Sequence, residues 1–512
     1  MRPTHAARRR LKAFAALLPL TASLLAPAAR AQSPDGEWVS VRTPRYLFVG
    51  NAPEEEVRRA AARFELFASA FSELFPALGA HADTPTRVFV FKDYESFRPF
   101  RPLYDGDAAD FRGYFQPGAD VNHIAVPLAL AGDDPQQVHN HEAVHLLLAA
   151  TARRVPDWLN EGLAQYYSTL KVSGGGALLG SPVARHAALL RKTKLLAPAR
   201  LFQIDRGARE YRTGAGRDLF YAQSWAVVHY LTSADGGRGH LRLFRFLEML
   251  ASGLTTEESF RRAFSLDYAA LERGLKEYVR RGRYETRELS VGGVAPGEAE
   301  LKGVPLGEAE AEFYLGDLLL HVGRFAEAEK HLRRSLALDR ASARAHASLG
   351  MALARQRRFP AARESLRRAV ALAPDNYLAH YYHAYALSRE DMEDEQTVEA
   401  YAPELAAEIR AALERAIRLE PRFPESYRLL AFVNLVTGER LDEATELLGR
   451  GLALAPNRPD LLFVLAQVQL RRGDRAAARA ALEKVAVNSA QPRLRARAES
   501  LLRELAAGVK SP

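Results

Sequence analysis

The sequence of 512 residues contains no cysteine. This absence excludes disulfide bonds, thiolate zinc sites, iron–sulfur clusters, a cysteine nucleophile and a lipidated N-terminal cysteine. Any metal ion must therefore be bound by histidine and carboxylate side chains. Long hydrophobic runs are absent as well, since the apolar stretch Ala13–Ala26 is about 14 residues long and contains Pro19. A membrane-spanning helix needs about 20 apolar residues, so we expect no stable membrane span.

The composition lacks any strong bias. Hydrophobic residues make up 48% of the chain and charged residues 26%, which is typical of globular proteins with two or three domains. The formal charge of +9 would by itself favour a nucleic acid or an anionic membrane as partner. Six of the positive charges lie in residues 1–31, which contain no acidic residue, so the rest of the chain carries +3. We therefore expect no nucleic-acid partner.

Residues 1–31 have the pattern of a secretory signal peptide. Arg8, Arg9, Arg10 and Lys12 precede the apolar stretch, and the segment ends in Ala-Arg-Ala, which puts small residues at the two positions that signal peptidase recognises. We expect cleavage after Ala31 and a periplasmic or secreted protein. A retained membrane anchor is the alternative, and it would need a longer apolar stretch.

The region from 32 to 289 is expected to be an α+β domain, with a small sheet and helices. Two short strand-like runs, 45–50 (RYLFVG) and 87–91 (RVFVF), flank a segment with helical periodicity at 54–74. A third strand is predicted at 122–127 (NHIAVP), directly before a helix at 135–151. Further helices are predicted at 157–170, 219–232, 240–251 and 268–281. Residues 290–308 are rich in glycine, proline and valine, which indicates a linker.

Beyond the linker the chain repeats itself. Gly316 and Gly350 are 34 residues apart, and so are Ala328 and Ala362. The period and these residue types resemble the tetratricopeptide repeat, so we expect an all-α solenoid over 309–512. Its helix pairs are predicted at 313–340, 341–376, 377 onward, 427–457 and 460–491, with a capping helix at 493–507. The third repeat carries about 13 extra residues, including an acidic segment at 390–395 that is expected to be a solvated loop. The groove of such an array would bind a protein or peptide partner.

One motif indicates chemistry. The segment His141-Glu142-Ala143-Val144-His145 is H-E-x-x-H within a predicted helix. Histidines four residues apart lie on one helix face, so both imidazoles can bind one metal ion at about 2.0–2.1 Å while Glu142 stays free to act as a base. Fifteen residues separate His145 from Glu161, which lies in the segment WLNEGLAQYY. A second helix that returns antiparallel to the first would bring this carboxylate to the same ion, and Gly162 and Ala164 would let the two helices pack closely.

These two motifs together resemble the gluzincin metallopeptidases, both the aminopeptidase-N-like branch and the smaller exported proteins called peptidase MA-like. The resemblance covers residues 45–281, and a tetratricopeptide array often follows the second group. It implies zinc bound by His141, His145 and Glu161, and hydrolysis of peptide bonds with Glu142 as general base. It also implies that Tyr221 donates a hydrogen bond to the oxyanion. A buried helical tyrosine without that role is the alternative.

The sequence departs from the aminopeptidase pattern at two places. The Gly-x-Met-Glu-Asn segment that binds a free amine is replaced by residues 119–127, which have no acidic residue in their second half. We therefore expect an endopeptidase, and the strand at 122–126 is a candidate for binding an extended peptide by β-augmentation. Some gluzincins orient a ligand histidine with an aspartate four residues after the ligand glutamate, whereas this chain has Gln165 there.

The other histidines are expected to be structural. His139 is predicted to be solvated, and His123 and His229 are the next candidates for a proton donor. His321 and the histidines at 331, 346, 380 and 383 fall at repeat positions and need no function. Two hypotheses follow for the whole protein: an exported zinc endopeptidase with a partner-binding repeat array, or an exported scaffold that keeps a metallopeptidase fold without activity.

Overall fold

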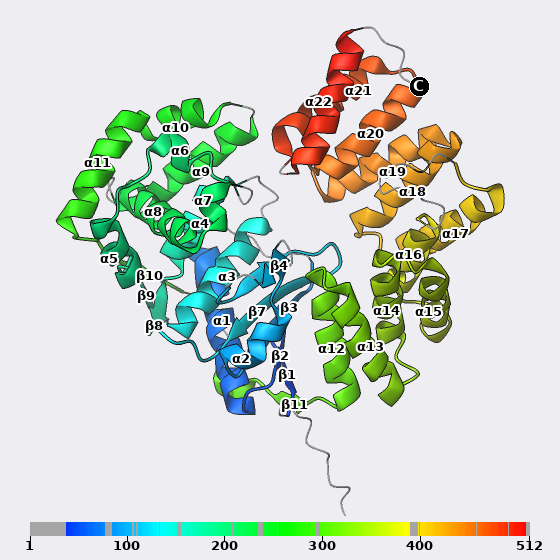
Figure 1. The fold of residues 1–512 in the computed structure, drawn as a ribbon, viewed down its shortest axis with the longest axis horizontal. Coiled ribbons are helices and arrows are strands. Elements are labelled where there is room, and N and C mark those ends of the chain that lie inside the picture. Colours follow the sequence, from blue (N-terminus) through cyan, green and yellow to red (C-terminus); the bar gives the residue numbers. More distant parts are fainter. Residues whose placement is uncertain are drawn as a thin grey trace, which may run out of the picture.

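The computed structural model in Figure 1 describes residues 37–507 apart from 77–83, 105–106, 109–110, 133, 151–154, 206–207, 234–238, 253, 293–296, 390–397, 399, 457 and 490. The predicted signal peptide and the acidic segment 390–395 lie outside the described residues. No helix in the described part of the chain has the length and apolarity needed to cross a membrane.

A six-stranded mixed sheet forms the centre of the N-terminal region. In spatial order its strands are β11 (Gly303–Pro305), β1 (Val39–Arg42), β2 (Tyr46–Gly50), β3 (Thr86–Phe91), β7 (Asn122–Pro127) and β6 (Tyr114–Gln116). Strands β2, β3 and β7 are parallel, and the remaining pairs are antiparallel. The three parallel strands coincide with the predicted ones. The sequence did not indicate β1, β6 and β11, because three or four residues are too few to show a clear alternation.

Different parts of the chain cover the two faces of this sheet. Val88 and Val90 point to one face and join the apolar cluster that contains residues of α1 (Glu54–Leu74) and α3 (Pro135–Ala149). Phe89 and Phe91 alternate with them and join a second cluster, which continues into α12 (Glu308–His321), the first helix of the repeat array. Successive side chains of a strand point to opposite faces, so the array is itself the second layer of the sheet.

A helical lobe follows α3 and lies on the side of the sheet opposite the array (Figure 1). Its helices are α4 (Asp157–Tyr167), α5 (Ala184–Lys192), α6 (Pro198–Leu201), α7 (Arg209–Arg212), α8 (Gly214–Ser233), α9 (Gly239–Ala251), α10 (Thr256–Phe264) and α11 (Tyr268–Arg281). A small antiparallel sheet of β10 (Arg287–Ser290), β9 (Gly176–Leu179) and β8 (Lys171–Ser173) borders the lobe. Short elements connect β3 to β6: α2 (Tyr94–Phe97), η1 (Arg98–Phe100), β4 (Leu103–Tyr104) and β5 (Asp107–Ala108).

Gly162 is required for the contact between α4 and α8. A Cβ atom at this position would lie 2.6 Å from the carbonyl oxygen of Ser224 and 2.7 Å from a methyl group of Val228, both in α8. The expectation that Gly162 lets α4 pack against α3 is therefore wrong. Gly162 follows Glu161 directly, and one residue turns a helix by about 100°, so the two residues face different neighbours.

The segment 290–308, predicted to be a linker, contributes to the fold at both ends. Ser290 ends β10, which pairs with β9, and β11 pairs with β1 at one edge of the central sheet. Between them lies the short helix η2 (Glu298–Glu300). The segment thus connects the lobe to the array while it extends the sheet.

The C-terminal region is a solenoid of paired helices. The pairs are α12 with α13 (Phe325–Leu338), α14 (Ala343–Arg355) with α15 (Phe359–Leu372), α16 (Tyr377–Leu387) with α17 (Pro403–Leu419), α18 (Pro424–Thr437) with α19 (Leu441–Leu454), and α20 (Pro459–Arg471) with α21 (Arg475–Asn488), followed by α22 (Pro492–Ala506). The repeated glycines bring the two helices of a pair together, because a Cβ at Gly316 or Gly350 would lie 2.7 or 2.4 Å from a leucine side chain of the second helix.

Candidate functional site

Helix α3 holds both histidines of the H-E-x-x-H motif on one face. The helix begins at Pro135, and the side chain of Asp134 caps it by accepting a hydrogen bond from the backbone of Gln136 (3.0 Å). One turn separates His141 from His145, and their Nε2 atoms lie 3.0 Å apart. The two imidazoles therefore face one common point, as the spacing predicts.

Helix α4 returns antiparallel to α3 and brings Glu161 to the same point. Gln137 contacts Ser168 at one end of the pair (3.3 Å), and His145 contacts Asn160 at the other (3.3 Å). Glu161 Oε2 lies 3.5 Å from His141 Nε2 and 3.7 Å from His145 Nε2. We call these three side chains, His141, His145 and Glu161, the site cluster.

The spacing of the site cluster fits a tetrahedral metal ion. Ligand atoms at about 2.0–2.1 Å from such an ion lie roughly 3.3 Å from one another. The observed separations of 3.0, 3.5 and 3.7 Å bracket this value. Two imidazoles and one carboxylate are also the donor set of open catalytic zinc sites, in which a fourth position is left for water or substrate. That the cluster binds zinc stays a prediction.

The charges around His141 favour a cationic group in this place. Burial disfavours protonation of the imidazole, but the hydrogen bond with Glu161 and the negative charges of Glu142 and Glu161 outweigh burial and raise the pKa of His141. The same carboxylates would stabilise a bound cation.

The amide that contacts a ligand histidine is Asn160. Its Oδ1 atom lies 3.3 Å from His145 Nδ1, where it can accept the ring proton and leave Nε2 free for a metal. Gln165, the position indicated by the gluzincin pattern, instead contacts Nε2 of His186 (3.0 Å). The amide oxygen of Gln165 is thus engaged with His186.

The site cluster lines a cavity of about 850 Å³, which also takes in Glu142 and Tyr221. Glu142 directly follows the first ligand histidine in α3, and its side chain is only 6% exposed. Tyr221, in α8, has its hydroxyl oxygen 3.0 Å from that of Tyr211. Burial, followed by the charge of Glu161, raises the pKa of Tyr221 well above its usual value, so its phenol stays protonated.

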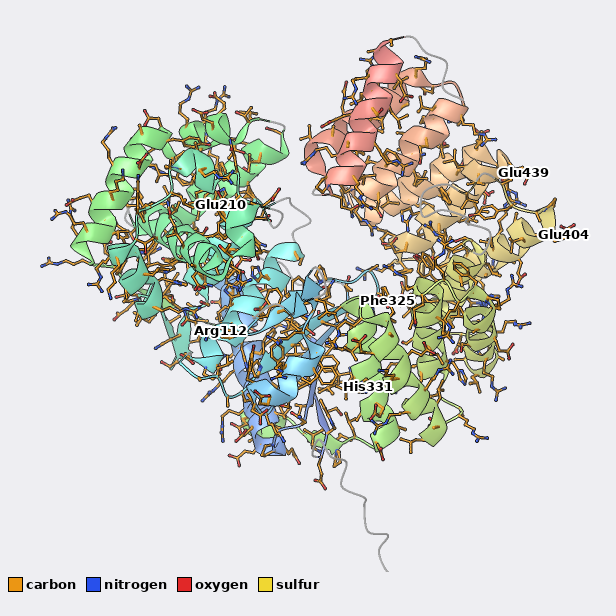
Figure 2. All side chains as sticks on the ribbon, viewed as in Figure 1. Arg112, Glu210, Phe325, His331, Glu404 and Glu439 are labelled. Atoms are coloured by element: carbon orange, nitrogen blue, oxygen red, sulfur yellow. The ribbon has the colours of Figure 1, made fainter. Side chains whose placement is uncertain are left out.

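Several other residues that line the cavity were not singled out from the sequence. They are His186 and Arg185 at the start of α5, Arg217 in α8, and Arg112, which lies between the sheet and the lobe (Figure 2). Burial and the positive charges of Arg185 and His141 lower the pKa of His186 to about 3, so this imidazole is neutral. No local motif marks these residues, because only the folded chain brings them to the cavity.

The remaining candidate histidines lie away from the cavity lining. His139 is buried, its Nε2 lies 3.3 Å from the carbonyl oxygen of Pro127, and burial lowers its pKa to about 4. The expectation of a solvated His139 is wrong, because this side of α3 packs against the sheet. His229 Nε2 lies 2.9 Å from the carbonyl oxygen of Gly180, and His123 lies between the sheet and α12.

Strand β6 is one of the two edge strands of the central sheet, and β11 is the other. β7, which was expected to bind an extended peptide at 122–126, is paired with β3 on one side and with β6 on the other. It therefore has no free edge, and this expectation is wrong. Strand β6 is the last strand of the sheet, and its residues Tyr114–Gln116 line the cavity. β6 is too short to be recognised from the sequence.

Comparisons with known proteins separate the two regions. A family described as a protein of unknown function (DUF1570) matches residues 137–252, the stretch that contains the site cluster, Glu142 and Tyr221. Tetratricopeptide repeat families match residues 313–377, 348–395 and 435–505. No curated protein matches the chain.

Two solved structures similar to this chain are described as tetratricopeptide repeat proteins. A thermophilic repeat protein of Thermus thermophilus is 23% identical, with 38% of this chain and 99% of that chain covered and a TM-score of 0.33. YrrB, a repeat protein with an unusual peptide-binding site, is 18% identical, with 38% of this chain and 92% of that chain covered and a TM-score of 0.29. The pilF protein of Pseudomonas aeruginosa is 22% identical, with 39% of this chain and 88% of that chain covered and a TM-score of 0.33. The C-terminal region, which two repeat families match between residues 313 and 505, is thus a tetratricopeptide repeat array that follows an α/β region.

Proposed function

We propose that the protein is an exported zinc-dependent endopeptidase, with the site cluster as its metal centre and Glu142 as its general base. The observation that carries the proposal is the convergence of three donor atoms, from α3 and α4, within 3.0–3.7 Å of one another in a cavity of about 850 Å³. The sequence pattern of a signal peptide at residues 1–31 supports export.

In this proposal each residue has a defined task. Zinc bound at the site cluster would act as a Lewis acid that activates a water molecule and polarises the scissile carbonyl. Glu142, one residue from a ligand and on the cavity wall, would take a proton from the attacking water and transfer it to the leaving amine. Tyr221, whose high pKa keeps it a hydrogen-bond donor, would stabilise the negative charge on the carbonyl oxygen in the transition state.

The surroundings of the cavity favour an extended peptide as substrate. Edge strand β6 lines the cavity, and an edge strand offers backbone hydrogen bonds to a peptide of any sequence. The only acidic residue between 117 and 127, Asp120, contacts His321 and Tyr382 of the repeat array. Its carboxylate is thus engaged with the repeat array, which supports internal cleavage.

The experiment compares the wild type with Glu142→Gln. We expect about one zinc per chain in both proteins by elemental analysis, because Glu142 is not a ligand. Cleavage of casein or of a peptide library should fall by about 10²–10⁴-fold in the variant. Glu272→Gln, a change on the surface of α11 that breaks the pair with Lys276, is the matched control. Zinc well below one per chain, or unchanged cleavage by Glu142→Gln, would contradict the proposal.

The repeat families favour a second candidate, an exported scaffold that binds a protein or peptide partner and has no peptidase activity. The same experiment separates the two, because a protein with intact zinc that cleaves neither casein nor any library peptide is the result expected of the scaffold.

A further inference from the structure

The turn between β6 and β7, residues 117–121, is docked on the repeat array. The first helices of successive pairs pack against one another, α12 with α14 and α14 with α16, and so form one continuous inner face. Asp120 of the turn lies on this face. Its Oδ1 atom accepts from His321 Nε2 in α12 (3.2 Å), and its Oδ2 atom accepts from the hydroxyl of Tyr382 in α16. One carboxylate thus bridges the first and third repeats and is only 11% exposed.

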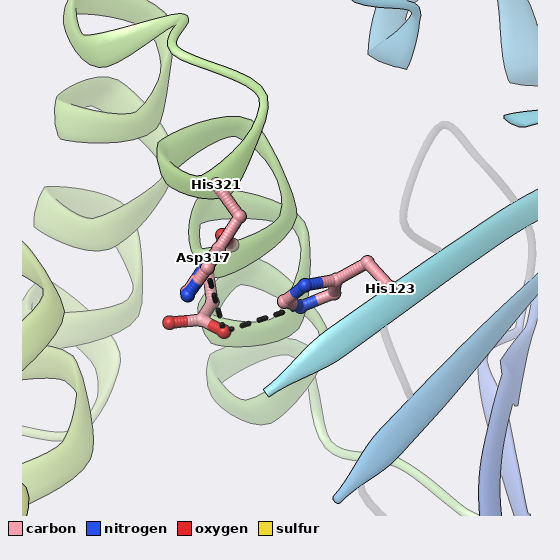
Figure 3. Close-up of side chains that lie close together, drawn as sticks. All are labelled: His123, Asp317 and His321. Atoms are coloured by element: carbon pink, nitrogen blue, oxygen red, sulfur yellow. Dashed lines mark hydrogen bonds and ion pairs between the residues drawn. The ribbon is translucent and has the colours of Figure 1, made fainter. Parts of the chain in front are cut away.

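A second set of contacts lies beside Asp120. Asp317 of α12 is paired with Arg87 of β3 and accepts a hydrogen bond from Ser348 of α14 (2.7 Å). Figure 3 shows Asp317 between His123 of β7 (3.5 Å) and His321 (3.7 Å). We call His123, Asp317 and His321 the interface cluster.

The charges of this region are balanced without a metal ion. Burial opposes the charge on His321, but Asp317 and Asp120 outweigh it and raise its pKa to about 9. Burial and the charge of His321 lower the pKa of His123 to about 4, so His123 is neutral. Two carboxylates then face two cations, Arg87 and His321. The interface cluster is compact enough to hold a metal ion, but the pair with Arg87 makes it an ion network between sheet and array.

The docked turn is continuous with the wall of the cavity. Strand β6 ends at Gln116, one residue before the turn, and Gln116 and Pro117 both line the cavity. The turn is tight, because a Cβ at Gly118 would lie 2.0 Å from the carbonyl oxygen of Val121. Asn122 Oδ1 also accepts from the backbone nitrogen of Gly118 (3.2 Å). Only three residues lie between Asp120 and Gln116, the last residue of β6.

We propose that the turn 117–121 is a built-in ligand of the repeat array, and that Asp120, His321 and Tyr382 are positioning residues that hold edge strand β6 at the cavity. The inner face of the first three repeats is then occupied within the chain by a segment of the α/β region. A tethered ligand of this kind has an effective concentration in the millimolar range, so it competes well with peptides in solution. The consequence for substrate binding rests on the proposed function, whereas the docking does not.

The test measures hydrogen–deuterium exchange of the full-length protein at residues 113–121. Asp120→Asn removes the charge that His321 and Tyr382 bind, and it should speed exchange in β6 and the turn by about tenfold. Tyr382→Phe removes one hydrogen bond and keeps all charges, so its effect should be about threefold. Glu439→Gln is the control. It breaks the pair with Arg410 (2.8 Å) within the array, and Figure 2 shows Glu439 on the outer edge of the array, away from the turn.

Kinetics supply the second readout. In Asp120→Asn we expect a KM for peptide substrates raised about fivefold, kcat within about twofold and zinc content equal to wild type, because β6 binds substrate and does not contact the reacting bond. A folded Asp120→Asn protein with unchanged exchange at 113–121 would overturn the inference. If Asp120→Asn fails to fold, exchange in Tyr382→Phe decides in the same way. If the wild type binds no zinc and cleaves no peptide, the proposed function is wrong. Hydrogen–deuterium exchange at residues 113–121 would still test whether the turn is docked on the array.

Discussion

The site cluster and the interface cluster contain the same residue types, two histidines and one carboxylate, and in each the donor atoms lie within 4.8 Å of one another. Their surroundings differ. The site cluster lines a cavity of about 850 Å³ and is built by two consecutive helices of one region. The interface cluster lies between a sheet strand and a repeat helix that are nearly 200 residues apart in the chain, and Arg87 is paired with its carboxylate.

From this difference we expect only the site cluster to bind a metal, although the two clusters are alike in ligand type and spacing. An arginine beside the carboxylate already supplies the positive charge that a metal would bring, and removing two charges from water is favourable only where they are well paired. An open cavity leaves room for water and substrate at a fourth coordination position, whereas a packed interface does not. Accessibility and charge balance therefore separate a candidate catalytic centre from a structural ion network.

The largest expected effect concerns zinc. His145→Ala removes one of three ligands, so zinc measured by elemental analysis of purified protein should fall from about one to below about 0.1 per chain. His321→Gln changes the interface cluster in a comparable way and should leave the zinc content unchanged. Zinc that disappears with His321→Gln and persists in His145→Ala would reverse the roles of the two clusters.

The next effect concerns stability. Asp317→Asn leaves Arg87 and His321 without their main counter-charge in a buried interface, so we expect a loss of about 3 kcal/mol in the free energy of unfolding. Glu161→Gln in the metal-free protein should cost less than about 1 kcal/mol, because the cavity admits water around the changed side chain. Urea unfolding of both variants, after treatment with a chelator, measures the difference. Equal losses would mean that the two clusters contribute equally to the free energy of unfolding.

A further effect on stability, of similar size at most, is a dependence on pH. The pKa of His321 is about 9 in the folded protein against about 6.5 unfolded, so its contribution to stability is complete below pH 6.5 and is lost as the pH rises to 9. The groups that face it are Asp120, Asp317, His123, Arg87 and Tyr382. Between pH 6.5 and 9 the wild type should lose up to about 3 kcal/mol of unfolding free energy.

His321→Gln provides the comparison for this pH dependence. We expect this variant to be less stable than the wild type at pH 6.5. Its free energy of unfolding should also change less between pH 6.5 and 9, since the group that titrates is gone. Calorimetric melting of both proteins at several pH values measures the two slopes. Parallel slopes for wild type and His321→Gln would show that another group is responsible.

Much of the fold follows from local patterns. The three parallel strands, helix α1 and the helix pairs of the array have strong periodicity, and their predicted bounds lie close to the observed ones. The convergence of His141 and His145 follows from the geometry of one helix, and the return of α4 with Glu161 follows from the short connection between two helices. Strands β1, β6 and β11 escaped prediction because each is short and is stabilised by neighbours distant in sequence.

Local sequence patterns account for the helix that carries the H-E-x-x-H motif, with Glu142 inside it, and for the period of the repeat array. Each pattern depends on residues within one or two helical turns or within one repeat of each other. No local pattern indicates that the array covers one face of the sheet, that Asn160 contacts His145, or that Asp120 contacts His321; these contacts are seen in the folded molecule alone. These contacts join residues up to about 200 positions apart, and their energy comes from burial and charge pairing that exist only once both regions have folded.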